Sequence, residues 1–231
     1  MSRSQDTPSR RHDPHAGIVA CPDGVAVALA ANDLEVAHTL TDGNCGYHAF
    51  GISYLAAAKV YPGVQALAAH KKLAKFKEPH ALAGFLRTSA AEWLRAHAAD
   101  IIIDNNLTVA QMCLYSSGRN ETFPEYLKRV ATNGEWADAS IIHALSCLHR
   151  VDCAIWQDAM DQCLLGISLM SAEDNHDRPL IHLAMRNDVH WWGVVPRPPE
   201  QRRPRETEEV FEQIVCACQG AGYGEVLSGS P

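Results

Sequence analysis

One cysteine, Cys45, stands where a polar turn changes into an apolar segment, in the stretch TDGNCGYHAF over residues 41–50. Asp-Gly and Gly-Asn pairs favour turns, and the apolar spacing of residues 49–60 predicts a helix. A cysteine in the first turn of a helix lies among free backbone N–H groups, at the positive end of the helix dipole. Both features favour the thiolate, so the pattern predicts a nucleophile. The same N–H groups could bind a developing oxyanion.

A cysteine nucleophile needs a histidine as base and acid, and usually an acceptor that orients the imidazole. The sequence favours His190, which opens an apolar segment after the turn-forming pair Asn187-Asp188. A residue at the start of a strand is accessible at one end and fixed by the sheet below it. His48 lies three residues after Cys45 on the same predicted helix face, and we expect it to be structural. His182, within a predicted strand, is expected in the core.

The segments that must position these residues consist of helices followed by a small sheet. Residues 17–40 are compatible with a short strand or a short helix. Helices are predicted over 49–60, 64–76, 79–100, 107–114, 123–130 and 135–150, and strands over 151–156, 163–170, 180–184 and 190–195. Helices in one part of the chain and strands in another indicate the α+β class.

Three regions differ in composition. Residues 1–29 are predicted to be a disordered or poorly ordered tail, and residues 30–197 a single domain. Residues 198–231 are predicted to hold a linker rich in Pro, Arg and Glu, a short helix over 210–217, and a tail rich in Gly and Ser.

The composition narrows the function classes. The chain has 231 residues, is 47% hydrophobic and carries a formal net charge of −7, which argues against a nucleic-acid-binding face. Its eight cysteines form no CxxC pair, which favours a reduced intracellular protein. We find no signal peptide and no long apolar run, and therefore expect a cytoplasmic monomer without membrane contact. A nuclear or secreted-effector location is also compatible with these features. No His/Cys set has the spacing of a metal site, so no metal is expected.

Three blocks of sequence, taken together in their order and spacing, resemble the OTU (ovarian tumour) family of cysteine proteases over residues 38–196. The first block is Asp42-Gly43-Asn44-Cys45 with the aromatic Tyr47 and Ala49-Phe50 after it. The middle block is FPEYL over residues 123–127 and GEWAD over 134–138, followed by a helix to His149. The closing block is LIHL over 180–183 and HWW over 190–192.

The resemblance implies a papain-like OTU fold with a small central β-sheet flanked by helices. It also implies a deubiquitinase, which would cleave the isopeptide or peptide bond after the C-terminal glycine of ubiquitin or a ubiquitin-like protein. By position, Cys45 would be the nucleophile and His190 the general base and acid. The backbone of Asp42, Gly43, Asn44 and Cys45 would form the oxyanion hole. No cofactor is implied.

The sequence departs from the family at Trp192, where many members carry Asn or Asp two residues after the catalytic histidine. An indole N–H only donates, so Trp192 cannot accept a proton from the imidazole. Asp188, Asn187, Asp42 and Asp33 are the alternatives that stay open for that role. Trp192 shares a strand face with His190 and is a candidate for lining the channel of a Gly-Gly tail. Trp136, Trp156 and Trp191 are expected in the core.

Two other functions compete with this interpretation. The first is an inactive or weakly active OTU-fold module that binds ubiquitin without cutting it, and Trp192 is the reason to consider it. The second is a different thiol hydrolase or an acyltransferase on a related papain-like scaffold.

Overall fold

The computed structural model describes residues 20–102, 106–158, 165–170, 178–186 and 190–202 of the chain. The helices are α1 (Asp23–Ala31), α2 (Cys45–Val60), α3 (Pro62–Ala66), α4 (Ala68–Leu73), α5 (Pro79–Ala96), α6 (Val109–Ser117), α7 (Phe123–Val130), α8 (Ala139–His149) and the 3₁₀ turn η1 (Pro199–Gln201). The strands are β1 (Leu34–Ala37), β2 (Asp152–Asp158), β3 (Leu165–Met170), β4 (Leu180–Arg186) and β5 (His190–Pro196). The predicted α+β class is confirmed.

The strands of the described residues form one mixed sheet in the order β1-β5-β4-β2-β3. The β4–β2 pair is parallel, whereas β1–β5, β5–β4 and β2–β3 are antiparallel. β5 therefore lies between two neighbours, with Val36 opposite Val194 on one side and Ala184 opposite Trp192 on the other. The strand that begins at His190 is fixed by hydrogen bonds along both of its edges.

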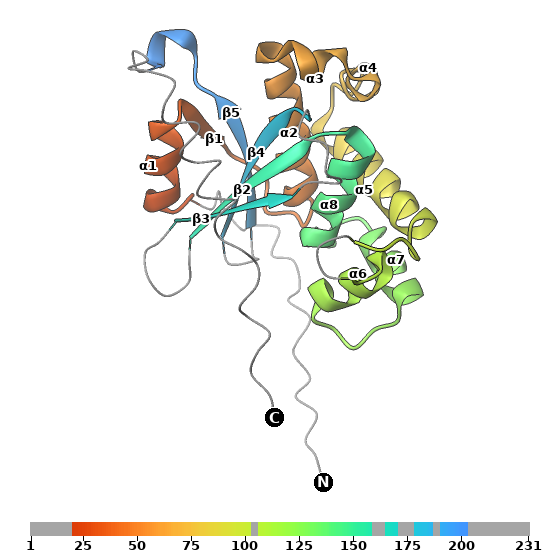
Figure 1. Cartoon of the computed structure of the whole chain (residues 1–231). Coiled ribbons are helices and arrows are strands. Elements are labelled where there is room, and N and C mark those ends of the chain that lie inside the picture. Colours follow the sequence, from red (N-terminus) through yellow and green to blue (C-terminus); the bar gives the residue numbers. More distant parts are fainter. Residues whose placement is uncertain (1–19, 103–105, 159–164, 171–177, 187–189, 203–231) are drawn as a thin grey trace.

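Helices cover both faces of this sheet, with α1 on one side and the larger group of helices on the other (Figure 1). On the α1 side, a small core contains side chains from α1 and the sheet, namely Val25, Leu29, Leu34, Trp156, Ala184, Trp192 and Val194. The larger core lies on the opposite face, where α2 packs along β5, α5 packs against α2, and α8 packs against α5. Because side chains alternate along a strand, Trp191 enters the larger core and Trp192 the smaller one.

Local capping explains where several helices begin and end. Thr108 caps α6 by accepting the Gln111 N–H at 3.2 Å, and Gly118 ends the helix with a φ of 59°. The Asp138 carboxylate accepts the N–H groups of Ser140 and Ile141 at 3.0 and 3.3 Å. The helix predicted over 135–150 therefore begins only at Ala139, because its first residues are an extended approach to this cap.

Three other predictions of element boundaries are wrong. The helix predicted over 64–76 is two short helices, α3 and α4, separated by an extended Leu67. The helix predicted from Ala49 already begins at Cys45. The predicted N-terminal tail over 1–29 includes the first residues of α1, whose Val25 and Leu29 are buried against the sheet. A burial pattern that depends on a distant partner is not visible in such a short segment.

Other predictions lie outside the described residues, among them the short helix over 210–217 and the Asn187-Asp188 turn. Of the linker predicted from residue 198, the structure describes the η1 turn. Among the described residues, no helix has both the length and the apolar character required to cross a bilayer.

Candidate active site

Cys45 is the first residue of α2, and its side chain is almost fully buried, with 1% exposed. The preceding residue, Asn44, makes no side-chain capping bond to the helix, so the first-turn N–H groups are not used up by a cap. The Cys45 thiol lies against the backbone N–H groups of Trp191 and Gly46, both of which favour its ionised form. The helix start and the beginning of β5 thus meet at this sulfur.

The prediction that the helix start would acidify Cys45 is wrong for this structure. Burial raises the pKa of the Cys45 thiol to about 11, and the N–H groups of Trp191 and Gly46 compensate only in part. The negative charge of Asp42 raises the pKa further. Desolvation disfavours any charged form, and it outweighs the helix-end effect because the sulfur is enclosed by the larger core.

The turn before Cys45 requires glycine at position 43. Gly43 has a φ of 76°, in the left-handed region that side chains with a Cβ resist. A Cβ at this position would also overlap the carbonyl group of Gly134, whose own φ is 85°. The turn and the segment before α8 therefore approach each other through two glycines, which fixes the backbone leading into Cys45.

Arg87 of α5 holds this turn from beneath, with only 2% of its surface exposed. Its guanidinium donates to the Asn44 side-chain oxygen and to the carbonyl oxygens of Val130 and Glu135, each at 2.7 Å, and to the Gly43 carbonyl at 3.3 Å. The same group lies 4.2 Å from the centre of the Tyr47 ring. One buried cation thus joins the turn before Cys45 to the segments around α7 and α8.

His190 opens β5 and is 3% exposed, beside Trp192 at a ring-centroid distance of 4.8 Å. Its Nε2 atom lies 3.1 Å from the Thr39 hydroxyl. That hydroxyl donates its single hydrogen to the Trp191 carbonyl, which can only accept. Thr39 must therefore accept from His190, so the proton sits on Nε2 and the lone pair on Nδ1.

Burial lowers the pKa of His190 to about 4, and the nearby His38 lowers it too, while Asp42 acts in the opposite direction. With the thiol pKa raised and the imidazole pKa lowered, Cys45 and His190 are both neutral at neutral pH. A proton transfer between them would create both charges in an environment that holds polar partners for each: backbone N–H groups at the sulfur and Thr39 at the imidazole.

Comparison with known proteins was made through sequence and through structure. No protein-family model matches the chain, and no curated protein matches its sequence. Among solved structures, the OTU domain of OTUD1 matches with a TM-score of 0.50 and 16% identity, over 74% of this chain and 91% of that one. The viral OTU protease of Taggert virus matches with a TM-score of 0.48 and 16% identity, over 73% of this chain and 83% of that one. The Hazara virus OTU bound to ubiquitin matches with a TM-score of 0.46 and 16% identity, over 71% of this chain and 82% of that one.

The chain has the fold of an OTU domain. The α+β arrangement expected from the three sequence blocks is therefore confirmed at the level of fold. Within this OTU fold, the closing block contacts the middle block, because the Trp191 indole donates its N–H to the Ala137 carbonyl at 3.0 Å.

The OTU fold places the other predicted site residues as follows. The prediction that Trp192 lines the substrate channel is wrong, because its side chain is fully buried in the α1-side core. Asp42 bonds to Asn44, accepting its backbone N–H at 2.9 Å and its side-chain amide at 3.1 Å. Asp33 lies at the α1–β1 turn, where its carbonyl accepts the Arg197 N–H. Asn187 and Asp188 lie outside the described residues.

The structural role expected for two histidines can be compared with their surroundings. His48 is 5% exposed in the first turns of α2, beside Asp42. His182 accepts the indole N–H of Trp156 at 3.1 Å, and burial lowers its pKa to about 4. Both are buried or partly buried among packed side chains.

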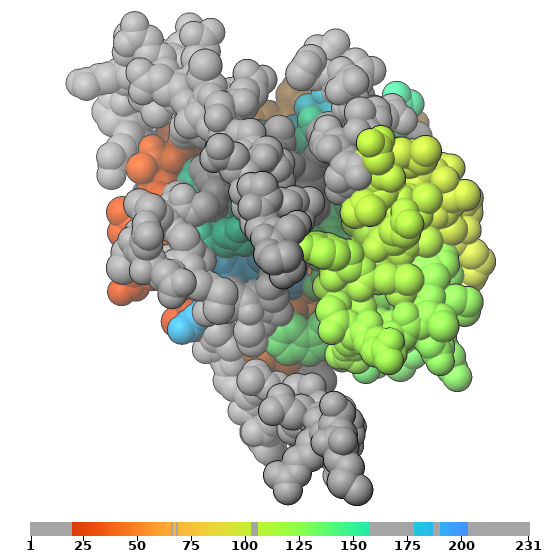
Figure 2. Space-filling model, turned by 60° about the horizontal axis from the view of Figure 1, so that its bottom comes forward, coloured from red at the N-terminus to blue at the C-terminus, as the bar shows by residue number. Residues whose placement is uncertain are grey.

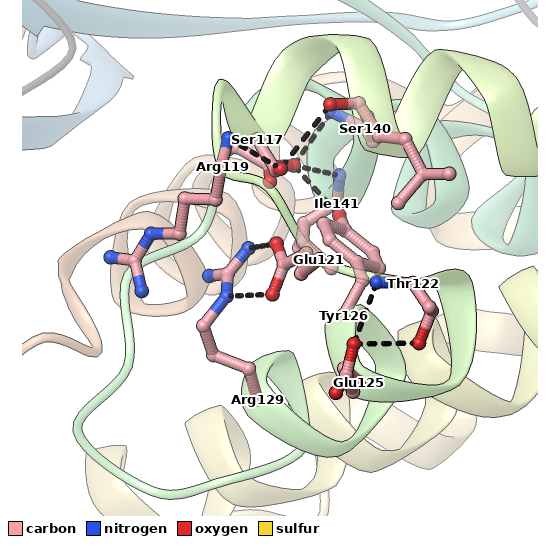
Figure 3. Close-up of polar contacts among 11 residues, drawn as sticks. Ser117, Arg119, Glu121, Thr122, Glu125, Tyr126, Arg129, Ser140 and Ile141 are labelled. Carbon is pink, nitrogen blue, oxygen red and sulfur yellow. Dashed lines mark hydrogen bonds and ion pairs between the residues drawn. The ribbon is translucent and has the colours of Figure 1, made fainter. Parts of the chain in front are cut away.

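A surface cavity of about 470 Å³ adjoins the site, and it shares Trp191 and Ala137 with the wall around Cys45. Its other side comes from the helical region of α6 and α7, which forms one side of the face seen in Figure 2. Trp136 lines the cavity and is 39% exposed, so its predicted place in the core is wrong. Figure 3 shows the bonds that hold this wall, including the Arg129–Glu121 ion pair at 2.8 Å.

Two residues that contact the site were missed from sequence. Thr39 is one, because a threonine before a turn carries no signal that it faces a distant histidine. Arg87 is the other, because it lies on the predicted helix 79–100 and charged side chains are mostly exposed. An arginine on the apolar side of that helix, between Ala83 and Ala90, was the available sign of a buried cation.

Proposed function

We propose that the chain is a cysteine hydrolase of the deubiquitinase type, with Cys45 as nucleophile and His190 as general base and acid. The observation that carries this proposal is the meeting of the α2 start with β5, where the Cys45 sulfur lies at the N–H of the residue next to His190. The OTU fold and the three matching sequence blocks support the substrate class, ubiquitin or a ubiquitin-like protein. Water-assisted turnover of the acyl-enzyme needs no cofactor.

The chemistry uses the neutral pair. His190 Nδ1 takes the thiol proton as sulfur attacks the carbonyl carbon after the C-terminal glycine of the modifier. Of the backbone N–H groups predicted for the oxyanion hole, those of Asp42, Gly43 and Cys45 stabilise the oxyanion, because the Asn44 N–H is already donated to the Asp42 carboxylate. The imidazolium then gives its proton to the leaving amine, and a water molecule activated by His190 hydrolyses the thioester.

Thr39 serves as the positioning residue in the place that Trp192 cannot fill. By accepting from Nε2, it holds the tautomer whose lone pair is on Nδ1, the atom that must take the thiol proton. It also stabilises the imidazolium once that proton has moved. The hydroxyl keeps its orientation because its own hydrogen is committed to the Trp191 carbonyl.

The cavity beside Trp191 is the place we assign to the substrate segment that precedes the scissile bond. It opens next to the site, and Trp136 presents a partly exposed ring to it. A flexible glycine-containing tail would approach Cys45 from there along the Ala137–Trp191 wall, which the indole hydrogen bond keeps in place.

The test is capture by ubiquitin carrying a C-terminal electrophile, followed by mass spectrometry of the adduct. The wild-type chain should form a covalent adduct on Cys45, and both Cys45→Ala and His190→Ala should lose it. The matched control is Cys153→Ala, which removes a fully buried cysteine of β2 outside the site. An adduct on another cysteine, or equal capture by Cys45→Ala, would refute the proposed nucleophile.

The second candidate function is an OTU-fold ubiquitin-binding module that does not cut. The raised pKa of Cys45 is the observation that favours it, because such a thiol is a poor nucleophile until a base takes its proton. Tight binding of unmodified ubiquitin, together with no adduct from the wild-type chain, would support this alternative and exclude the enzyme.

A further inference from the structure

We propose that Asp42, His48 and His80 form a binding site for a divalent transition-metal ion of the zinc type. The three residues come from the turn before Cys45, from α2 and from the first turn of α5. In the described part of the chain, they are the one group of three such side chains whose ligand atoms all lie within 4.8 Å of one another. This proposal does not depend on the proposed hydrolase function.

The distances suit one shared ion. Asp42 Oδ2 lies 3.6 Å from His48 Nε2 and 3.5 Å from His80 Nδ1. Zinc binds nitrogen and oxygen at about 2.0–2.1 Å in a tetrahedron, which places its ligand atoms about 3.3 Å apart. The two distances from Asp42 therefore need side-chain shifts of only a few tenths of an ångström, and the two imidazole nitrogens lie within 4.8 Å of each other. The separations are also too long for direct hydrogen bonds.

His48 gives the independent sign of a ligand. Its side chain is 4% exposed, and its Nε2 atom is buried without a hydrogen-bond partner. Buried polar atoms almost always have a partner, and leaving one unpaired costs about 1–3 kcal/mol. This nitrogen faces Asp42, where a bound ion would supply the missing partner.

The Asp42 carboxylate is already oriented for such a role. Asn44 donates its backbone N–H to Oδ1 and its side-chain amide to Oδ2. Asn44 is in turn held by Arg87, which donates to the Asn44 side-chain oxygen at 2.7 Å. Partners of this kind, which fix a ligand without touching the metal, are usual around metal sites.

The donor set selects the class of ion. Two imidazole nitrogens and one carboxylate oxygen suit zinc and its transition-metal neighbours, whereas magnesium and calcium prefer oxygen ligands alone. The His80 side chain is 66% exposed, so the ion can enter from solvent and keep a water molecule as its fourth ligand. The bound ion would tie the turn before Cys45 to the start of α5.

The test is calorimetric titration of the full chain with Zn²⁺, together with its melting temperature with and without the ion. His80→Asn removes one ligand at an exposed position, where the fold should be unaffected. We expect one tight site in the wild-type chain, an affinity at least about tenfold lower in His80→Asn, and a Zn²⁺-dependent rise in melting temperature that the variant loses. The matched control is His97→Asn, which removes a histidine from the other end of α5.

Two further outcomes would overturn the metal site. Equal Zn²⁺ affinity in wild type and His80→Asn would place the ion elsewhere, and no binding at all would leave only a carboxylate–imidazole cluster. The titration is repeated in Cys45→Ala, which should still bind, because a loss there would make the thiol a ligand and contradict the proposed set. Since none of these measurements uses ubiquitin, failure of the metal site and failure of the hydrolase proposal are distinguishable.

Discussion

The described part of the chain buries a cysteine and a histidine in each of two regions, and the histidine has a hydrogen-bond partner in only one of them. In the first, Cys45 lies at backbone N–H groups and His190 contacts the Thr39 hydroxyl. In the second, at the α8–β2 junction, His149 packs against the rings of Phe50 and Tyr54 at 5.5 and 5.8 Å. Neither ring nitrogen of His149 makes a hydrogen bond, and Cys153 is fully buried in β2.

The difference shows that burial alone does not prepare these residues for chemistry. Burial lowers the pKa of both histidines to about 4 and raises the pKa of both thiols. What separates the regions is whether a positive charge formed on the imidazole would meet a hydrogen-bond partner. His190 has an acceptor on Nε2 and a lone pair left on Nδ1, whereas His149 would become an isolated buried cation.

The largest expected effect is on turnover. His190→Ala should lower the rate of cleavage of a ubiquitin C-terminal fluorogenic substrate by about 10²–10⁴-fold, the usual contribution of a general acid–base group. His149→Ala should leave the rate per folded molecule unchanged and lower stability instead. Similar losses of turnover in both variants would remove the distinction between the two regions.

The next effect concerns acid stability at His149. Its pKa is lowered by burial from 6.5 to about 4, so below pH 6.5 the unfolded chain binds a proton that the folded chain refuses. Stability is therefore full above pH 6.5 and falls as the pH drops towards 4, by about 3 kcal/mol from this residue at most. Urea unfolding at pH 7 and pH 4.5 measures the loss.

The matched variant for this measurement is His149→Phe, which keeps an aromatic ring and removes the titrating group. It should lose less stability on acidification than the wild-type chain. Burial also lowers the pKa values of His182 and His190 to about 4, so these two histidines account for part of the stability that the His149→Phe variant still loses in acid. An identical loss in wild type and His149→Phe would show that His149 is not the acid-sensitive group.

A smaller effect is expected at Thr39. Thr39→Val keeps the shape but leaves His190 Nε2–H and the Trp191 carbonyl unpaired, which should lower kcat by about tenfold to a hundredfold. Thr39→Ser should restore most of the rate. ¹⁵N NMR of His190 should show the Nε2-protonated tautomer in wild type and Thr39→Ser, and a mixture in Thr39→Val. A lower rate with an unchanged tautomer would make Thr39 a packing residue only.

The smallest expected effect is on the reactivity of the Cys45 thiol. With a pKa of about 11, Cys45 of the free protein should be alkylated by iodoacetamide about tenfold faster for each unit between pH 7 and pH 10. Cys153 should stay unlabelled while the chain is folded. A Cys45 rate that reaches its plateau below pH 8, measured by peptide mass spectrometry, would mean that the helix start does acidify the thiol.

Much of the local structure was predictable because it depends on neighbouring residues. The helix α7 and the strands β2, β4 and β5 follow from short patterns of turn-forming, polar and apolar residues. The division of residues 62–73 into α3 and α4 was not predictable from periodicity, because Leu67 is extended in a segment whose apolar spacing is helical. The place of α1 against the sheet depends on Trp192 and Val194, far along the chain.

The order of the blocks, the polar turn that leads through Cys45 into a helix, and the strand that begins at His190 are properties of the sequence, since each depends on a few adjacent residues. Only the tertiary structure shows the raised pKa of the thiol, the contact between Thr39 and His190, the burial of Trp192, and the grouping of Asp42 and His48 with His80. The physical reason is that desolvation and hydrogen bonding depend on which distant segments surround a group, and no local pattern carries that information.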